Sequence, residues 1–506
     1  MAETSRLLSI LELSSDVAQH VEPLLTSFQA LNDGEKEGAR LNIAGKIFLL
    51  VFGEDASLQS DSTFSDRKET VWSTSCWLEP AIIVLPRTAQ DVAKALAISR
   101  FFNLKFSVRG GGHLHTPGSN SNVGGVVIHM RYFDKVDLSD DHSDVTFGAG
   151  LRWIQVYEAL EPHGLAVTGG RVPSVGVAGL LLGGGLSFQN SEYGLSCNGV
   201  VNYEIVLADS SVVNVSATEN QDLFWALKGG GTNFGIVTKF TMRTVSNKIW
   251  AQGKVVAPSN NDQLHKALFK YHEAAEKDMK ATLICNQMRD STLLVFVYNE
   301  SVEERPAVFD AFKEVEAVAQ MVPPGTYTIY QMLKGVEHVN ATEQRNHDMR
   351  TMSSLPDIEA YNTAEKLRLE SEEIIKDVPG SSIMMVIQPI SSTAIRAAES
   401  TGGSPTGLKA QPHQWFLILI DWANPEDEEK VLGASRKIVD GVDAVTKKNG
   451  TYLDFKYSNY SSRDQNPLES YGAENLQKLT SIAKSYDPEG VFQTLQNGGW
   501  LVSKAV

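Results

Sequence analysis

The alternation of apolar and polar positions divides the chain into a helical beginning and a longer, mixed remainder. Apolar residues recur at intervals near 3.6 over residues 7–11 and again over residues 21–28, which is the period of an amphipathic helix. We therefore expect residues 1–70 to form a helical extension. It is either an arm that packs on the rest of the protein or a pair of helices that binds a partner.

From residue 71 to residue 245 short apolar runs alternate with helical segments. Residues 82–86 and 125–130 have the continuous apolar character of buried strands. Thr88 follows the first of these runs and is placed to cap a helix. The pattern predicts a domain in which helices and strands alternate.

Residues 246–450 contain fewer glycines and more charged, amphipathic segments than the part before them. Alternation predicts strands at residues 293–298 and 415–421, which indicates an antiparallel sheet. The chain is thus predicted to have an α+β fold, with a second domain at 246–450 and a tail at 451–506 that contains a helix. Amphipathic helices are expected at residues 264–277, 306–318, 364–376 and 474–486.

One motif gives the first indication of what the chain binds. A predicted strand at residues 104–108 runs directly into Arg109, three glycines and His113. Glycine allows positive φ and brings backbone N–H groups close to an anion, and the guanidinium of Arg109 suits a phosphate. The motif indicates a turn that binds the pyrophosphate of a nucleotide cofactor, with the His113 imidazole near the reactive ring.

Two further glycine-rich stretches follow, at residues 169–185 and 229–235. Small residues at this density let the backbone approach something flat, since no side chain stands in between. A single glycine triplet is often only a loop. Three of them, each next to predicted regular structure, are hard to explain as loops alone.

The order of these motifs resembles a known family. R-G-G-G-H, P-S-V-G-x-x-G and D-L-F-W-A-L-K-G-G-G-x-N-F-G-I-V-T resemble the FAD-linked oxidases of the berberine-bridge-enzyme-like group, in the vanillyl-alcohol-oxidase/p-cresol-methylhydroxylase (PCMH) superfamily. The tail agrees at residues 457–460 and 486–493. The resemblance is close over 75–245 and 450–500, holds in outline over 246–450, and hardly extends to the first 70 residues.

The resemblance implies how the chain is divided and which cofactor it binds. Residues 71–245 would be a PCMH-type FAD-binding domain of two α+β subdomains, and residues 246–450 a substrate domain whose antiparallel sheet covers the isoalloxazine. Residues 451–506 would return to the FAD domain. The residues expected to bind FAD are His113, Arg109, Gly110, Gly111, Gly112, Pro173, Val175, Gly176, Gly179, Gly235, Ile236, Val237 and Asn459.

In the family, the histidine at the position of His113 forms a covalent bond to the flavin 8α-methyl carbon, and a neutral imidazole is a suitable nucleophile. Many members carry a second link, through a cysteine at the position where this chain has Val172. We therefore expect a single covalent link through His113, with non-covalent FAD as the alternative. A valine at the position of Val175 accompanies oxidases in the family, which implies dioxygen as the electron acceptor.

The resemblance also suggests catalytic residues. Tyr457 matches a tyrosine of the family's tail motif, Gln388 matches a substrate-domain strand position that precedes a proline, and Tyr193 is a further candidate. A free phenol has a pKa of about 10, so Tyr457 needs a neighbour to act as a base near neutral pH. Gln388 can orient a substrate but cannot abstract a proton, and the carboxylate that some members use is missing there.

Composition excludes several other classes. The 506 residues carry a formal net charge of −16, which argues against nucleic acid or an anionic membrane as a partner. The N-terminus shows no secretory signal, so an intracellular, cytoplasmic location is expected. The three cysteines are too few and too scattered for a disulfide framework or a zinc site, and no metal is expected. Four histidines are interpreted as single surface or loop residues: His115, His129, His142 and His163.

The leading hypothesis is an FAD-dependent oxidase that acts on a small organic substrate in secondary metabolism and returns hydrogen peroxide. A flavin-dependent isomerase or cyclase without net redox change is the alternative, and the missing carboxylate base is compatible with it. A non-catalytic binding protein that kept the fold is a third hypothesis, which the intact glycine turns and His113 argue against.

Overall fold

A computed structural model gives the structure of the chain and describes residues 2–69, 71–336 and 344–505. The first sheet has the order β1 (Ala56–Leu58), β2 (Ile82–Val84), β4 (Val126–His129), β3 (Phe106–Arg109). β2, β4 and β3 pair in parallel, and β1 adds to β2 in the antiparallel sense. Helix α5 (Ala89–Phe101) follows β2, and the Thr88 hydroxyl accepts a hydrogen bond from the Asp91 backbone N–H at its start.

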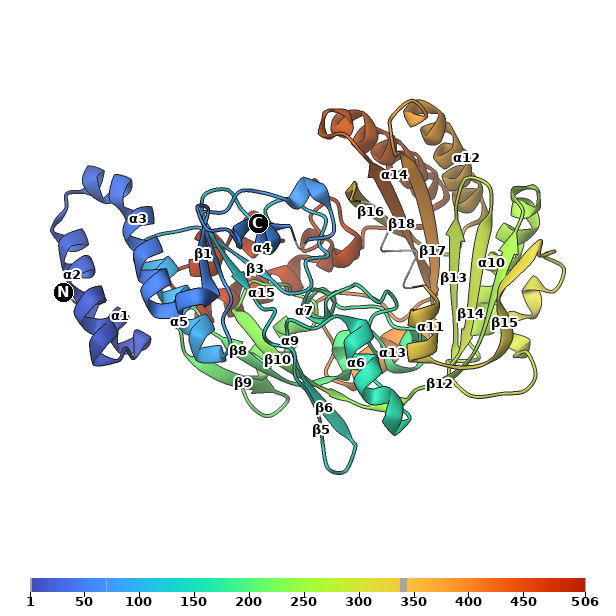
Figure 1. Ribbon diagram of the computed structural model, residues 1–506. Helices are drawn as coiled ribbons and strands as arrows, with labels where there is room; N and C mark the ends of the chain where they lie inside the picture. Colours follow the sequence, from blue (N-terminus) through green and yellow to red (C-terminus); the bar gives the residue numbers. More distant parts are fainter. Residues whose placement is uncertain (1, 70, 337–343, 506) are drawn as a thin grey trace.

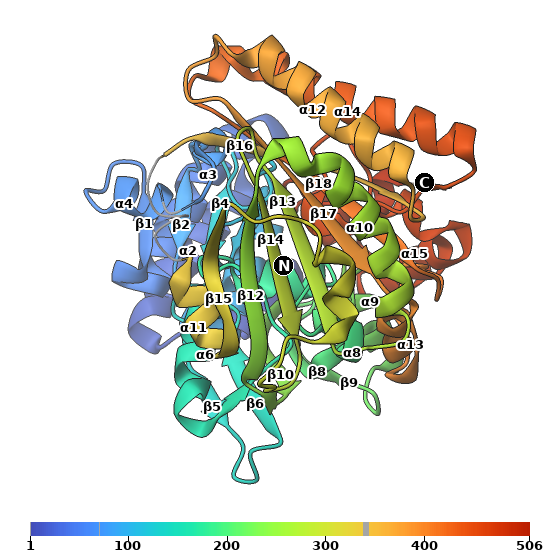
Figure 2. The same cartoon turned by 90° about the vertical axis from the view of Figure 1, so that its right-hand side faces the viewer.

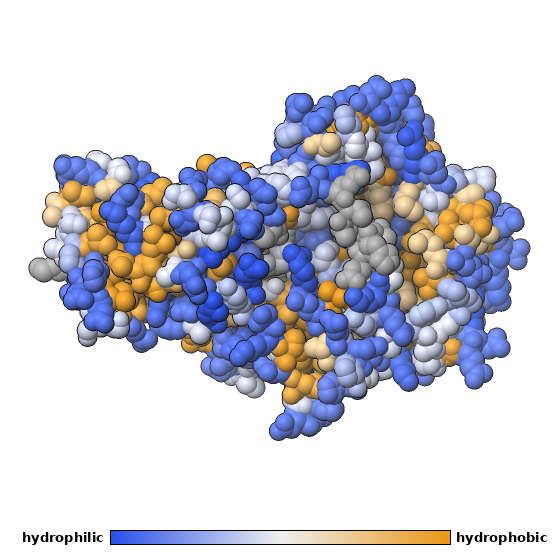
Figure 3. Space-filling view, in the orientation of Figure 1, coloured by the Kyte–Doolittle hydropathy of each residue, from blue (hydrophilic) through white to orange (hydrophobic). Residues whose placement is uncertain are grey.

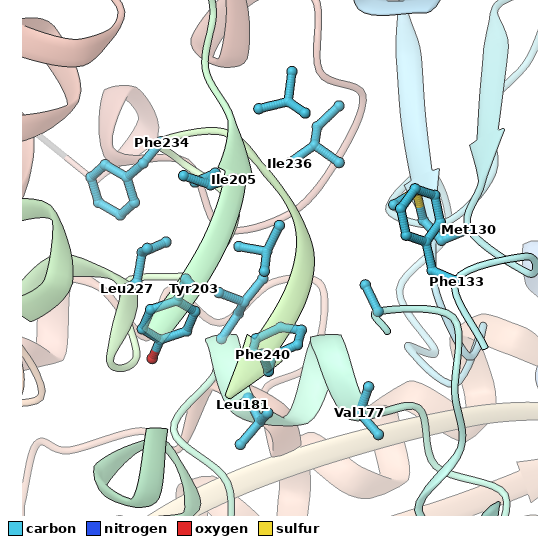
Figure 4. Packing of buried hydrophobic residues seen from close by; sticks show 14 of the residues in the cluster. Met130, Phe133, Val177, Leu181, Tyr203, Ile205, Leu227, Phe234, Ile236 and Phe240 are labelled. Carbon is cyan, nitrogen blue, oxygen red and sulfur yellow. The ribbon is translucent and has the colours of Figure 1, made fainter. Parts of the chain in front are cut away.

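The second sheet is antiparallel and has the order β5 (Val136–Leu138), β6 (Asp144–Gly148), β10 (Ile236–Arg243), β8 (Val200–Val206), β9 (Val212–Ser216). Its apolar face packs against α7 (Val177–Leu182), and Figure 4 shows Phe240 and Tyr203 on this side near Leu181. The helices of this region are α6 (Trp153–Leu160), α7, α8 (Asn190–Tyr193) and α9 (Gln221–Leu227). A small pair, β7 (Leu165–Ala166) with β11 (Val245–Ser246), leads into the third sheet.

The third sheet contains eight strands, all paired in the antiparallel sense. Helices α10 (Asn261–Ala275), α12 (Ile358–Ile375) and α14 (Glu428–Asn449) lie on one of its faces (Figure 2). The shorter α11 (Ile329–Gly335) and α13 (Ser392–Ser400) lie at its side. The strand order is β15 (Ala319–Thr328), β12 (Lys248–Val256), β14 (Thr292–Tyr298), β13 (Ala281–Gln287), β17 (Ser382–Ile390), β18 (His413–Trp422), β16 (Asn346–Ser354), β19 (Tyr452–Leu453).

The two faces of this sheet belong to different cores, because side chains alternate along each strand. Ile387 and Phe416 pack beneath the covering helices. Val386 and Leu417, one position away on the same strands, pack with the core of the first half of the chain. One face of the eight-stranded sheet is therefore turned toward the first two sheets (Figure 1).

The tail returns to the first sheet. The Phe106 N–H donates to the Leu495 carbonyl at 2.9 Å, and the Asn497 N–H donates back to the Phe106 carbonyl at 2.7 Å. Asn233, in the third glycine stretch, accepts from the Val502 N–H and donates to the Trp500 carbonyl. Helices α15 (Ala473–Tyr486) and α16 (Val491–Thr494), red in Figure 1, lie in this tail.

The N-terminal helices α1 (Ala2–Leu11), α2 (Ser15–Ala30) and α3 (Asp33–Phe52) pack on the first half of the chain. Phe28 of α2 contacts Phe101 and Phe102 at the end of α5. In Figure 3 apolar surface gathers over these helices, where Leu41 and Leu49 of α3 are exposed. They thus pack as an arm, while a partner for their exposed side stays a prediction. The short helix α4 (Phe64–Lys68) follows β1.

Two expectations are wrong in detail. The helix expected at residues 306–318 is a 3-10 helix, Ala307–Phe312, because the chain must straighten in time for Ala319 to pair with Val255 in the sheet. His129 is buried in β4 rather than on the surface or in a loop, and His115, although it lies in a loop, is buried. The His115 ring reaches the Ser461 carbonyl, 346 residues along the chain, which local sequence does not reveal.

Candidate active site

The site begins where two glycine turns lie against each other. A Cβ added to Gly111 would stand 2.3 Å from the Gly176 Cα, and one added to Gly176 would stand 2.6 Å from the Gly111 Cα and N. A Cβ on Gly110 would approach the Ala149 carbonyl oxygen to 2.9 Å. Only glycine allows this close approach of the turn after β3 and the turn before α7. The contact places His113 beside residues 172–175.

His113 is held from two directions. Its Nε2 lies 3.1 Å from the Ser174 hydroxyl, and its ring stacks on the Trp72 indole with centroids 4.3 Å apart. Burial, with a smaller effect of the Arg152 charge, lowers the pKa of His113 to about 3. The imidazole is therefore neutral at physiological pH, which is the form that can act as a nucleophile.

The stack continues into the eight-stranded sheet. The other face of Trp72 lies on the His347 ring, with centroids 4.0 Å apart and planes 3° from parallel. His347 Nδ1 lies 2.6 Å from the Asp421 carboxylate on β18. Trp72, His347 and Asp421 also line a cavity of about 970 Å³, together with Met384 and Leu419 on the face of the sheet that looks toward the first half.

The Arg109 side chain is fully buried and donates hydrogen bonds to the backbone. Its guanidinium donates to the carbonyl oxygens of Asn120, Arg67 and Lys68 at 2.9, 2.7 and 3.2 Å. These bonds hold the loop around the first glycine turn. The expected contact of Arg109 with a phosphate stays a prediction.

The second and third glycine stretches hold the tail. A Cβ on Gly183 would stand 2.1 Å from the Asn459 Oδ1, and the Asn459 amide donates to the Leu180 carbonyl and to the Tyr457 hydroxyl, each at 3.0 Å. The Tyr471 hydroxyl donates to the Gly229 carbonyl at 3.0 Å. Asn459 thus joins the glycine stretch around α7 to Tyr457.

Other residues expected to bind a cofactor lie around this framework. Gly179, in the first turn of α7, is exposed, and a Cβ there would meet no atom within 4 Å. Pro173 is buried and Val175 half-buried, and both accept backbone hydrogen bonds from the start of α6. The remaining three, Gly235, Ile236 and Val237, lie at the start of β10 and are buried against β8.

A polar cluster faces these turns from the tail and the sheet. The Gln388 side chain on β17 is buried, and its amide donates to the Tyr460 hydroxyl at 3.0 Å. Arg171, in the second glycine stretch, donates to the same hydroxyl at 3.1 Å and to the Gln388 side-chain oxygen. Tyr457 packs edge-on against Tyr460 and stacks on Trp415. The structure thus brings Tyr457 and Gln388 together through Tyr460.

Tyr457 is poorly suited to be a base as it stands. It is only 2% exposed, and burial raises the pKa of its phenol well above the ordinary value, although the Asn459 hydrogen bond and the charge of Arg171 oppose this effect. Tyr193 lies apart from the cluster. It is 37% exposed at the end of α8, and burial together with the neighbouring Glu192 raises its pKa.

Sequence reasoning missed five residues of this site as functional side chains: Trp72, Ser174, Arg171, His347 and Tyr460. Ser174 and Tyr460 stand next to residues chosen as candidates, and Arg171 stands in the second glycine stretch. Their roles come from contacts with distant segments, since Arg171 and Gln388 are 217 residues apart. Among the described residues no group of three or more His, Cys, Asp or Glu side chains could hold a metal ion.

The described residues fit a flat, anionic cofactor. Two glycine turns meet without side chains between them, the exposed Gly179 opens the first turn of α7, and a neutral imidazole stands at the edge of the turn. Residues 80–216 match the family described as FAD binding domain. An FAD-dependent monooxygenase of Arthrobotrys oligospora is 37% identical over 89% of this chain and 88% of its own length.

The chain belongs to the FAD-linked oxidoreductases of the PCMH-type, berberine-bridge-enzyme-like family. The bifunctional solanapyrone synthase of Alternaria solani is a further relative of this oxidoreductase, 33% identical over 83% of this chain and 81% of its own length. FAD is its cofactor, and the expected α+β fold of the PCMH type is confirmed. The domain bounds and the binding of substrate by residues 246–450 stay predictions.

Solved structures share the fold of this FAD-linked oxidoreductase. Glucooligosaccharide oxidase from Acremonium strictum superposes with a TM-score of 0.76 at 20% identity, covering 91% of this chain and 97% of that one. The 6-hydroxy-D-nicotine oxidase from Arthrobacter nicotinovorans gives 0.73 at 21% identity, covering 89% and 98%. No described helix of the chain is both long enough and apolar enough to span a bilayer.

Proposed function

We propose that this FAD-linked oxidoreductase is an oxidase with its cofactor held by one covalent bond to His113. It takes a hydride from a small organic substrate and passes the electrons to dioxygen, which becomes hydrogen peroxide. The observation that carries the proposal is the position of the neutral, oriented His113 on glycine turns that face the Arg171, Gln388, Tyr460 and Tyr457 cluster. A role in secondary metabolism rests on the resemblance stated above.

FAD, when bound, accepts a hydride at N5 and returns the electrons to an acceptor. The chain supplies the binding surface and the orientation. The glycine turns let the backbone approach the cofactor, and His113 would hold it through the 8α carbon. Val172 offers no thiol for a second bond, and the three cysteines are buried elsewhere in the chain. The single link through His113 follows from these residues.

The polar cluster is the part that would orient the substrate. Tyr460 receives hydrogen bonds from both Arg171 and Gln388, so its hydroxyl is fixed and its own proton can point to a ligand. The apolar face of the sheet around it, with Val386 and Leu417, would exclude water from the reacting carbon. Tyr457 and Tyr193 as catalytic residues, and Val175 as the position that admits dioxygen, stay predictions.

Oxygen consumption tests the proposal. The purified yellow protein is given a panel of small alcohols, amines and aldehydes, and dioxygen uptake and hydrogen peroxide are measured together. We expect one peroxide for each dioxygen with a matching substrate. A variant H113A would lose most of this activity, whereas the exposed control H163A would keep it. Incorporation of labelled oxygen into the product without peroxide would contradict the proposal and indicate a monooxygenase, the activity named for the Arthrobotrys relative.

A second candidate is a flavin-dependent isomerase or cyclase without net redox change. It is favoured by the raised pKa of Tyr457 and by the amide, rather than a carboxylate, at position 388, since neither group readily removes a proton. Turnover under strict exclusion of dioxygen separates the two. A non-redox enzyme continues at an unchanged rate, whereas an oxidase stops after one reduction of its flavin.

A further inference from the structure

Arg171 extends from the second glycine stretch to the substrate sheet. Its Nη2 donates to the Tyr460 hydroxyl and to the Gln388 side-chain oxygen, so the guanidinium is held by two neutral groups. Both partners are themselves restrained, because the Gln388 amide also donates to Tyr460. The fork of the guanidinium is therefore fixed before any ligand arrives.

Arg171 has no acidic partner in the described part of the chain. No Asp or Glu oxygen lies within 4 Å of its guanidinium, in contrast to Arg368, which bonds Glu365 and Glu372. An arginine keeps its charge at every physiological pH, and a charge withdrawn from water is costly unless an opposite charge meets it. Arg171 is half-buried, so its charge is partly withdrawn from water.

Apolar side chains share the face of the sheet that carries Gln388. Met384 and Val386 lie on the same face of β17 as Gln388, because they are four and two positions before it, and Trp415 pairs with Gln388 from β18. A fixed cation at an apolar surface is a site for a molecule that is mostly apolar and carries one anionic group. The planar fork of a guanidinium matches the two oxygens of a carboxylate.

We propose that the substrate of this enzyme carries a carboxylate, and that Arg171 binds it and so determines specificity. The inference rests on the proposed function, whose active site it describes. Tyr460 and Gln388 are positioning residues in this scheme, since they hold the guanidinium in place. The carboxylate stays ionised throughout, and Arg171 therefore anchors the substrate without taking part in hydride transfer.

The test compares three ligands of nearly equal shape. Binding of 3-phenylpropanoate, its amide and its methyl ester to the flavin-containing enzyme is measured by titration calorimetry, which requires no turnover. In the wild type we expect the acid to bind roughly tenfold or more tightly than the amide and the ester. In R171Q this preference should disappear, in R171K it should return in part, and the exposed control R131Q should keep it in full.

Two outcomes would overturn the inference. In one, the acid binds no better than its amide and ester to the wild type. In the other, R171Q keeps the preference for the acid. Flavin content and dioxygen uptake of the same samples are recorded separately, so a failure of the oxidase proposal is recognised by those two measurements. A loss of flavin in R171Q alone, together with the first of these outcomes, would assign Arg171 to the cofactor.

Discussion

At the scale of single residues, Ser174 orients His113. The hydroxyl lies 3.1 Å from Nε2, while Trp72 fixes the plane of the ring, so Nδ1 is the nitrogen left to form a bond. In S174A the loss of about 1 kcal/mol of hydrogen bonding should slow formation of the flavin bond roughly fivefold. The flavin that stays with acid-precipitated protein is followed over time.

The conservative variant S174T retains the hydroxyl and should restore most of the rate. Equal rates in S174A and the wild type would show that the Ser174 contact has no part in orienting His113.

The Tyr460 hydroxyl accepts a hydrogen bond from the eight-stranded sheet, through Gln388, and one from the second glycine stretch, through Arg171. In Y460F both donors, Arg171 and Gln388, lose their shared acceptor. Because hydrogen bonds to charged groups contribute about 1.5–3 kcal/mol, we expect kcat/KM to fall by roughly ten- to a hundredfold. Y452F is the matched control, since the Tyr452 hydroxyl bonds Asp454 away from the cluster, and it should change little. Similar losses in both variants would contradict this role.

At the scale of elements, the contact between the two glycine turns determines whether a cofactor can be bound. In G176A the new Cβ would meet the Gly111 backbone at 2.6 Å, so one turn must move. We expect a loss of about 1–3 kcal/mol in unfolding free energy and a marked loss of bound flavin. Calorimetry and the flavin-to-protein absorbance ratio measure both.

G433A is the control for that substitution. Gly433 lies inside α14, where a Cβ would meet no atom within 4 Å, and alanine is the better helix former there. This variant should be as stable as the wild type or more stable. If G176A were also stable and fully yellow, the close approach of the turns would not matter for the cofactor.

The elements differ in how far local sequence predicts them. Strands such as β14 and β18 and helices such as α15 follow their apolar period, so the pattern predicts them within two residues at each end. The segment Ala307–Phe312 did not become a long helix, because pairing of Ala319 with Val255 competes with local helix propensity. β1 was missed because its pairing with β2 is a contact with another part of the chain.

Contacts between segments that are far apart in the sequence also explain which parts of the site were missed. Glycine turns are visible locally because glycine alone adopts their backbone and tolerates their contacts. The partners of Arg171, in contrast, come from β17 and the tail, and only the folded chain brings the three segments together. Likewise, the burial of His115 depends on Ser461, far along the chain.

At the scale of the whole molecule, buried histidines make the fold sensitive to acid. Burial lowers the pKa of His115 and His129 to about 3, and of His272 and His413 to about 4. In the unfolded chain these histidines take up protons near pH 6.5. Their contribution to the free energy of unfolding is therefore complete above that pH and is lost as pH falls toward 4. Asp348 has the opposite effect. Burial raises its pKa to about 6, so its contribution to the free energy of unfolding is lost as pH rises through 6.

Burial also lowers the pKa of His113 and His265, so six histidines lose stability on acidification, against three carboxyls whose pKa burial raises, Asp348, Glu372 and Asp443. The melting temperature should therefore fall as pH drops from 7 to 5. The variant H413Q should show a shallower fall, because one titrating group is gone, and the exposed control H163Q should follow the wild type. A melting temperature that is constant or rises toward pH 5 would contradict this account of the buried histidines.

One imidazole, that of His113, is proposed to carry the flavin. The most direct measurement is to precipitate the yellow protein with acid, digest it, and determine the mass of any flavin-bearing peptide. We expect flavin to stay with the polypeptide and to be found on the peptide that contains His113, with no second attachment. Release of free FAD into the supernatant, or its attachment to another residue, would contradict the proposal.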